Sequence, residues 1–228
     1  MKHLLIIVTM WLLIGCGSDQ KQNVPLESSV DSVSYSIGVD IGKSMRAQEL
    51  EMNEKALFEG WSSSYQGKDL KLTEDEMLSV LKAFQTEMQE KSRIRANAQA
   101  EKNLKEGEDF LAENGKRDSV ITTESGLQYK IIQQGDGPIP KSTDKVSVHY
   151  RGTLINGEEF DSSYNRGKPA TFPVTGVIKG WTEALQLMPV GSKWELYVPS
   201  SLAYGNGSRG PGGPNSTLIF EVELLGIE

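Results

Sequence analysis

The sequence predicts an α+β protein, with a C-terminal antiparallel β-sheet wrapped on one short α-helix. An all-α region that ends in a long connecting helix precedes this sheet. Up to residue 115, apolar residues recur with helical spacing, whereas beyond it they alternate with polar residues as in strands. Clusters of Gly, Pro and Asn separate the alternating segments, and a helical pattern returns only over 181–187. Many short strands with one helix fit an antiparallel α+β domain.

The chain has 228 residues, which is enough for one or two domains, and its formal net charge is −7. We expect no nucleic-acid partner, because phosphate binding requires clustered Lys and Arg. Beyond the N-terminus, no apolar run is long enough to cross a bilayer, which takes about 20 residues.

The first sixteen residues resemble the signal peptide of a bacterial lipoprotein. The positive start Met1-Lys2-His3 precedes an apolar run over 4–14 that is too short to span a membrane. Cys16, the single cysteine of the chain, closes a lipobox-like Leu-Ile-Gly-Cys and is the expected lipidation site. The alternative is an ordinary signal peptide with a chance cysteine. A lipid anchor would hold the protein in the bacterial cell envelope. Gly17, directly after the cysteine, favours the outer membrane, with the protein facing the periplasm. Exposure of the protein on the cell surface is the alternative.

Residues 17–28 are polar and are expected to form a flexible tether. Helices are expected over 31–50 and 55–65, and the first has an apolar face made of Val33, Ile37, Ile41 and Met45.

A long helix is expected over about 74–114, within a helical dimerisation domain at 29–115. It begins at a capping box formed by Thr73 and Glu76, and at about 1.5 Å per residue it would be roughly 60 Å long. Beyond Lys91 its apolar stripe almost vanishes, which is typical of a helix that bridges two domains through solvent. Gly107 is expected to weaken the helix locally.

Three motifs in the sequence are poor candidates for function. Residues 38–44 resemble a phosphate-binding loop but are one residue short and lie inside a helical pattern. Residues 205–210 match Gly-x-Gly-x-x-Gly, yet no helix follows to bind a pyrophosphate. His149 lies between two apolar strand residues, and His3 lies in the signal peptide. We therefore expect no nucleotide, no metal and no other cofactor.

After the linker at 116–123, six segments follow one another with a distinctive spacing. They are 146–163, 166–172, 177–181 (VIKGW), 188–191 (MPVG), 202–205 (LAYG) and 217–225. In these segments residues 124–228 closely resemble the FK506-binding-protein (FKBP) family of peptidyl-prolyl cis-trans isomerases. Any single segment would be weak support, but all six occur in order and in register.

The resemblance implies a site as well as a fold. Trp181 would form the floor of a small apolar pocket that receives proline, and the Ile178 amide and Tyr204 hydroxyl would donate to substrate carbonyls. Asp161 would lie at the rim, held by Tyr150 and Arg166. The implied catalytic residues are Asp161, Tyr204, Trp181 and Phe160. The implied substrate-binding residues are Tyr150, Arg166, Phe172, Val177, Ile178 and Phe220.

Two features depart from the family pattern. Ala170 stands where many members have an aromatic wall residue, so the pocket would be wider on that side. The loop at 205–214 is rich in glycine and lacks the apolar residues often found before the last strand. Both features leave the substrate preference open.

The N-terminal half resembles the isomerases of the macrophage-infectivity-potentiator and FkpA-like lipoprotein group. The similar segments are 34–38 (SYSIG), 56–60 (ALFEG), 110–114 (FLAEN) and 125–130 (SGLQYK). The resemblance implies a V-shaped homodimer joined through the N-terminal helices. The apolar faces of these helices support this independently, because they are too small to form a stable core in a monomer. A monomer with loosely held N-terminal helices is the alternative.

The expected function is rotation of X-Pro bonds in unfolded exported polypeptides, which assists their folding. FK506- or rapamycin-type inhibitors are the expected small-molecule ligands. The alternatives are a holdase-type chaperone, or a binding module in which isomerisation is incidental.

Overall fold

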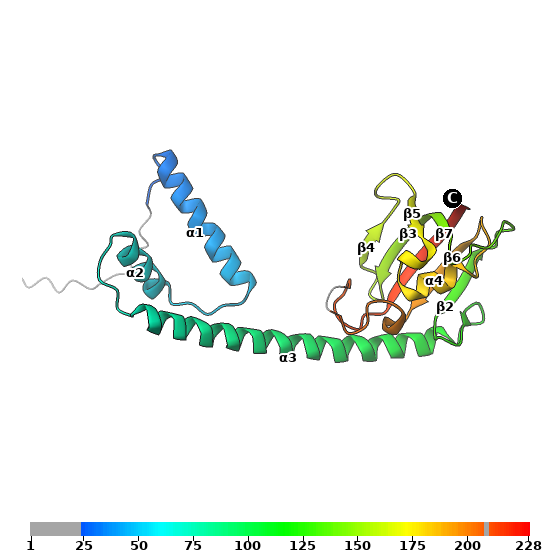
Figure 1. Ribbon diagram of the computed structural model, residues 1–228, viewed down its shortest axis with the longest axis horizontal. Coiled ribbons are helices and arrows are strands. Elements are labelled where there is room, and N and C mark those ends of the chain that lie inside the picture. The colour runs from blue at the N-terminus through cyan, green and yellow to red at the C-terminus, as the bar shows by residue number, and fades with distance from the viewer. Residues whose placement is uncertain (1–23, 208–209) are drawn as a thin grey trace, which may run out of the picture. The chain divides into compact units, whose positions relative to one another are not determined.

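The computed structural model describes residues 24–207 and 210–228 (Figure 1). Its contacts divide the chain into two compact units, with the boundary between Thr73 and Glu74. The expected signal peptide, Cys16 and most of the tether lie outside the described residues. In the described part of the chain, no helix has the length and apolar character needed to cross a membrane.

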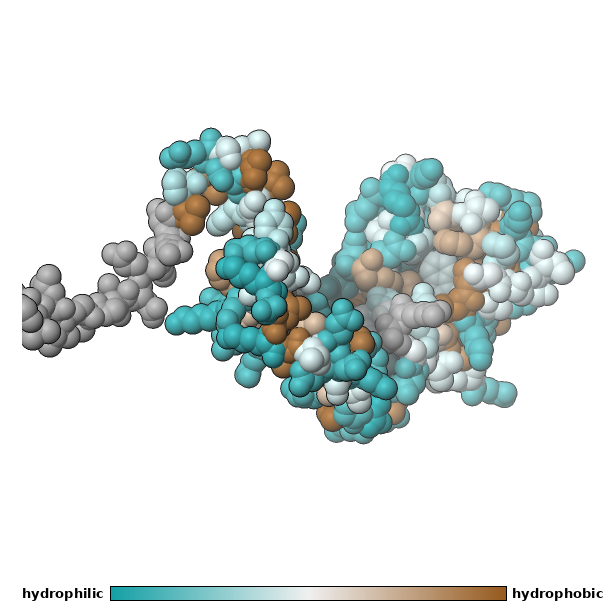
Figure 2. Space-filling view, turned by 60° about the vertical axis from the view of Figure 1, so that its left-hand side comes forward, coloured by the Kyte–Doolittle hydropathy of each residue, from teal (hydrophilic) through white to brown (hydrophobic). Residues whose placement is uncertain are grey.

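The first unit contains helices α1 (Ser29–Ala47) and α2 (Glu54–Tyr65). Ser28 begins α1 with a capping box: its hydroxyl accepts from the Asp31 N–H, and the Asp31 carboxylate accepts from the Ser28 N–H. Asn53 caps α2 in a similar way. Neither helix buries a residue, and Figure 2 shows hydrophobic residues gathered on the surface of these helices.

Helix α3 (Glu74–Asn114) opens the second unit and is the long helix that the sequence predicts. Its buried residues are Ala100, Gly107 and Asn114, at seven-residue spacing, so they form one stripe along the helix. Its C-terminal part therefore packs on the sheet domain, and the expectation of a helix exposed all round fails there. The sequence predicts a domain boundary at residue 115. The contacts instead divide the chain before Glu74, so α3 belongs to the same unit as the sheet.

Gly107 has a packing role that the sequence does not suggest. A Cβ at this position would lie 2.3 Å from Oγ1 of Thr217, which is shorter than any real contact. The glycine lets α3 approach the chain just before the last strand.

The sheet has seven antiparallel strands in the order β1-β2-β6-β7-β3-β4, and β5 pairs with β3. The strands are β1 (Ile121–Thr122), β2 (Gln128–Gln133), β3 (Lys145–Leu154), β4 (Glu159–Ser162), β5 (Ala170–Pro173), β6 (Lys193–Val198) and β7 (Leu218–Ile227). Helix α4 (Lys179–Leu185) lies against the sheet; the 3-10 turn η1 (Val174–Gly176) precedes it, and a second one, η2 (Ser200–Leu202), follows β6. The core forms where α4 buries Trp181 and Leu185 against residues of β3, β6 and β7.

The predicted α+β fold class is confirmed, including the single short helix on the sheet and the long helix before it. Trp194, Leu196 and Val198 alternate along β6 and are all buried. The two longest strands, β3 and β7, follow the expected alternation of buried and more exposed residues.

Candidate functional site

Trp181 lies in the first turn of α4 at the centre of a cluster of aromatic rings. Its ring is nearly perpendicular to those of Tyr150 and Phe220, both with centroids at 5.3 Å, and to that of Phe172 at 6.0 Å. Trp181 is 4% exposed, and Tyr150 and Phe220 are each 6% exposed. Such edge-to-face packing holds each ring in one orientation. The structure therefore brings the expected floor together with three of the expected substrate-binding residues.

Phe160 and Gly152 complete one side of the cluster. The Phe160 ring stands edge-on to Phe220 at 5.6 Å. A Cβ on Gly152 would lie 2.6 Å from the Phe160 ring, so only glycine at this point of β3 lets that ring pack down on the strand. Gly152 is a site residue that the sequence does not reveal, because a single glycine in a strand has several explanations.

A polar triangle of Tyr150, Asp161 and Arg166 borders the aromatic cluster. The Tyr150 hydroxyl donates to Oδ2 of Asp161 at 2.5 Å and accepts from Nη2 of Arg166 at 2.7 Å. Nη1 of Arg166 donates to Oδ1 of Asp161. The Asp161 and Arg166 side chains remain 41% and 44% exposed. These three residues thus meet as the family resemblance implies.

The environment of this triangle shifts the pKa of each member. Partial burial acts to raise the pKa of Asp161, but hydrogen bonds from Tyr150 and Arg166 outweigh it and hold this pKa below the ordinary value. Burial, together with the hydrogen bond to Asp161, raises the pKa of Tyr150. The hydrogen bond to Asp161 raises the pKa of Arg166. At neutral pH the site therefore carries a carboxylate, a neutral phenol and a guanidinium.

Val177 and Ile178 connect η1 to α4, and both pack against the core cluster while remaining partly exposed. The Ile178 carbonyl accepts from the Thr182 N–H at 3.0 Å. Among the described residues, the Ile178 N–H has no intramolecular acceptor. Ala170 lies partly exposed on β5, opposite Val148.

Tyr204 follows η2 on the glycine-rich loop and is 50% exposed. The Tyr204 ring packs closely on Gly210: a Cβ added to Gly210 would lie 2.8 Å from the ring. In the described part of the chain, no ring contact or hydrogen bond links Tyr204 to the aromatic cluster, although its neighbours Leu202 and Ala203 pack against the core. Tyr204 is thus the one expected catalytic residue that the structure does not join to the others.

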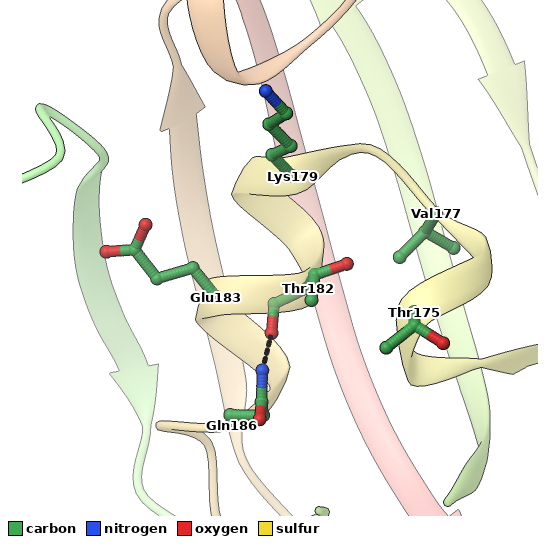
Figure 3. Close-up of a pocket in the computed structure, with 6 residues that line it drawn as sticks. All are labelled: Thr175, Val177, Lys179, Thr182, Glu183 and Gln186. Atoms are coloured by element: carbon green, nitrogen blue, oxygen red, sulfur yellow. Dashed lines mark hydrogen bonds between the residues drawn. The ribbon is translucent and has the colours of Figure 1, made fainter. Parts of the chain in front are cut away.

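A hollow of about 440 Å³ lies on the outer side of η1 and α4 (Figure 3). It shares Val177 with the expected site, and its other lining residues are Thr175, Lys179, Thr182, Glu183 and Gln186. Gln186 donates to the Thr182 carbonyl at 2.7 Å. No sequence signal marks these polar residues. Among the described residues, no group of His, Cys, Asp and Glu is arranged to hold a metal ion.

A sheet wrapped on one short helix, with an aromatic cluster at that helix and a carboxylate at its rim, defines the class of FKBP-fold isomerase domains. Residues 137–225 match the family model for FKBP-type peptidyl-prolyl cis-trans isomerase, and residues 30–131 match that for the domain amino terminal to it. The chain belongs to the FKBP-type peptidyl-prolyl cis-trans isomerase family. It is accordingly an isomerase of peptidyl-prolyl bonds that acts on proline-containing substrates.

Curated relatives cover nearly the whole chain. The outer membrane protein MIP of Legionella longbeachae is 47% identical over 89% of this chain and 88% of its own length. The peptidyl-prolyl cis-trans isomerase Mip of Coxiella burnetii is 41% identical over 100% of this chain and 99% of its own. The crystal structure of FkpA from Escherichia coli matches with a TM-score of 0.71 at 35% identity, over 90% of this chain and 99% of that one.

Proposed function

We propose that the aromatic cluster around Trp181 is the proline-binding pocket and that isomerisation takes place above it. The supporting observation is the packing of Trp181, which is perpendicular to three other rings and almost fully buried. The walls of the pocket are formed by Tyr150, Phe160, Phe172, Val177, Ile178 and Phe220. Arg166 contacts the substrate near the rim, where it holds Asp161.

The reaction asks for little chemistry from these residues. The barrier to rotation of an X-Pro bond, about 18–20 kcal/mol, comes from amide resonance, and no bond is made or broken. A twisted amide has less charge separation than a planar one, so an apolar pocket favours the twisted state, which is differential binding of the transition state. The Ile178 N–H, which has no acceptor among the described residues, and the Tyr204 hydroxyl donate to substrate carbonyls. The Asp161 carboxylate positions and polarises the substrate at the rim.

A protease-coupled assay on a proline tetrapeptide tests this site. We expect Trp181→Ala, Phe160→Ala and Asp161→Ala each to lower kcat/KM, and an FK506-type inhibitor to compete with the substrate. Full activity in all three variants, with the fold intact by circular dichroism, would refute the site.

The substrates of this enzyme are unfolded exported polypeptides, for which uncatalysed prolyl isomerisation takes tens of seconds or more. A holdase activity is the alternative, and it is measured in the same variants. If Trp181→Ala has lost isomerisation and still prevents aggregation of an unfolded client, the two activities are separate. If aggregation then proceeds unchecked, isomerisation is what assists folding.

The chain forms a homodimer through its N-terminal helices. This proposal is supported by α1 and α2, which bury no residue, and by a row of exposed rings on α2. Phe58, Trp61 and Tyr65 form that row, with Trp61 stacked on Tyr65 at 5.4 Å. Exposed apolar surface of this kind marks an interaction site. Light scattering on residues 17–228 tests it: a dimeric mass is expected, with a shift towards monomer in Trp61→Glu, and a monomeric wild type refutes it.

The protein is anchored in the cell envelope, at the outer membrane facing the periplasm, by lipid on Cys16. The lipobox-like sequence supports this, as does the name of the Legionella relative, an outer membrane protein. Membrane fractionation of the wild type and Cys16→Ala is the test. A wild-type protein found free of membranes would refute the anchor.

A further inference from the structure

The loop that follows Tyr204 is fastened to helix α3 by one side chain. Nδ2 of Asn103 donates to the carbonyl oxygens of Gly212 and Pro214, at 3.0 and 2.7 Å, and to Oγ of Ser216 at 3.1 Å. In Figure 1 the orange-brown segment that contains this loop lies on α3. One amide group therefore serves three acceptors that are 109 to 113 residues away in sequence.

The orientation of the Asn103 amide is itself fixed. Nε2 of Gln99 donates to Oδ1 of Asn103 at 2.7 Å, so the amide nitrogen faces the loop. Near Asn103 on the helix, the Ala100 carbonyl accepts from Nδ2 of Asn215 at 3.4 Å. Asn215 has a positive φ of 57°, which persists only where the surroundings hold it. The loop backbone is thus held at several points from α3.

The same loop controls the surroundings of Tyr204. The Asn215 N–H donates to the carbonyl of Gly205 at 2.7 Å, which bonds the part held by α3 to the residue directly after Tyr204. Gly210, within the loop, packs on the Tyr204 ring. A displacement of the loop from α3 would therefore be transmitted to Tyr204 by one hydrogen bond and one ring contact.

We propose that Asn103 is a positioning residue for the isomerase site, which holds residues 210–216, and through them Tyr204, from the connecting helix. The connecting helix is then part of the scaffold of the active site as well as a spacer. This inference rests on the proposed role of Tyr204 in substrate binding.

The test uses residues 17–228 with the variants Asn103→Ala and Asn103→Asp. The Asp variant keeps the shape of the side chain but replaces the donor with an oxygen that repels the three acceptors. Asn97→Ala is the matched control, because Asn97 is exposed on the same helix. If Asn103→Asp does not fold, Asn103→Ala alone carries the test.

We expect Asn103→Ala to lower kcat/KM on a proline tetrapeptide by about three- to tenfold, since it removes hydrogen bonds that each contribute modestly. Asn103→Asp should lower it further, and Asn97→Ala should leave it unchanged. Amide hydrogen exchange over 204–217 should become faster in both Asn103 variants. Unchanged exchange in this segment, or unchanged kcat/KM despite faster exchange, would overturn the proposal.

A double-mutant cycle with Tyr204→Phe separates positioning from general destabilisation. If Asn103 acts through Tyr204, the loss caused by Asn103→Ala should shrink to less than about twofold in the Tyr204→Phe background. An equal loss in both backgrounds would overturn the proposal. Full activity of Tyr204→Phe would refute the role of Tyr204 and this inference with it, whereas the proline pocket is judged separately by Trp181→Ala.

Discussion

The hydroxyl group of Tyr150 donates a 2.5 Å hydrogen bond to Oδ2 of Asp161, so a residue of the buried aromatic cluster holds a half-exposed carboxylate beside it. Tyr150 is on β3, with its ring edge-on to Trp181, and Asp161 is on β4. Arg166 bonds both residues at once. Substitution of any one of these three residues therefore removes a hydrogen bond from each of the other two.

Tyr150→Phe tests how far the triangle depends on one hydroxyl. The variant keeps the ring in the aromatic cluster but removes one hydrogen bond from Asp161, which keeps those from Arg166 and the Ser162 backbone. We expect a loss of about 1 kcal/mol in the free energy of unfolding, typical of one hydrogen bond, and a several-fold fall in kcat/KM. Urea denaturation and the tetrapeptide assay measure the two effects. Unchanged values in both would show that the hydrogen bond does not organise the rim.

The lowered pKa of Asp161 predicts a stability effect at acid pH. Because this pKa is lower in the folded protein than in the unfolded chain, the carboxylate stabilises the fold above the unfolded value of about 3.9. That contribution is lost as pH falls through the folded pKa. We expect wild type to exceed Asp161→Asn in free energy of unfolding at pH 6, with the difference shrinking below about pH 4.

Urea denaturation of both proteins from pH 6 to pH 3 gives this difference directly. The other carboxylates contribute equally to wild type and variant, so they cancel in it. A difference that stays constant with pH would contradict the pKa shift.

The sequence predicts the sheet domain well where one face of a strand is buried. Val146, Val148 and Tyr150 alternate with polar residues, and all three are buried. The triangle at the rim joins residues of different elements, so no periodicity reveals it. It was expected only because the segments around Asp161 and Arg166 resemble those of the FKBP family.

The packing of α3 on the sheet could not be predicted in this way. Its buried stripe consists of Ala100, Gly107 and Asn114, which are small or polar, so a search for apolar residues passes over it. Asn103 beside the stripe is also polar, and its acceptors lie in a distant loop. From the sequence, Gly107 is expected only to weaken an exposed helix. Its close packing against Thr217 is visible only in the structure.

Trp181 and Trp194 offer a matched pair of buried indoles, 4% and 3% exposed. Neither indole N–H has a hydrogen-bond partner among the described residues, so replacement by Phe removes no hydrogen bond. Trp194 is on β6, stacked on Tyr129 at 4.3 Å, and is not part of the proposed site. We expect Trp194→Phe to lower the melting temperature and leave kcat/KM unchanged.

Trp181→Phe should lower kcat/KM only a few-fold, because an aromatic floor remains. Trp181→Ala should abolish most activity and lower the free energy of unfolding by about 3–5 kcal/mol, as large-to-small changes in a core do. Thermal unfolding and the tetrapeptide assay on all variants separate the two effects. An equal loss of activity in Trp194→Phe and Trp181→Phe would mean that the pocket floor has no special role.

Gly107→Ala tests the close approach of α3 to the last strand. In an exposed helix this substitution stabilises by about 1 kcal/mol. Here the new Cβ would lie 2.3 Å from Oγ1 of Thr217, so we expect a loss of about 1–3 kcal/mol instead, as in an overpacked core. Asn97→Ala serves as the control for helix propensity, since Asn97 is exposed on the same helix.

The double variant Gly107→Ala/Thr217→Ala identifies the contact responsible. Thr217→Ala removes Oγ1, and the nearest remaining atom, Cβ of Thr217, is 3.2 Å from the new methyl group. The double variant should therefore be less destabilised than the sum of the two single variants, by an amount that measures the clash. Urea denaturation of the four proteins gives this coupling energy. If the destabilisations of the two single variants simply add in the double variant, the strain of Gly107→Ala arises elsewhere on the helix.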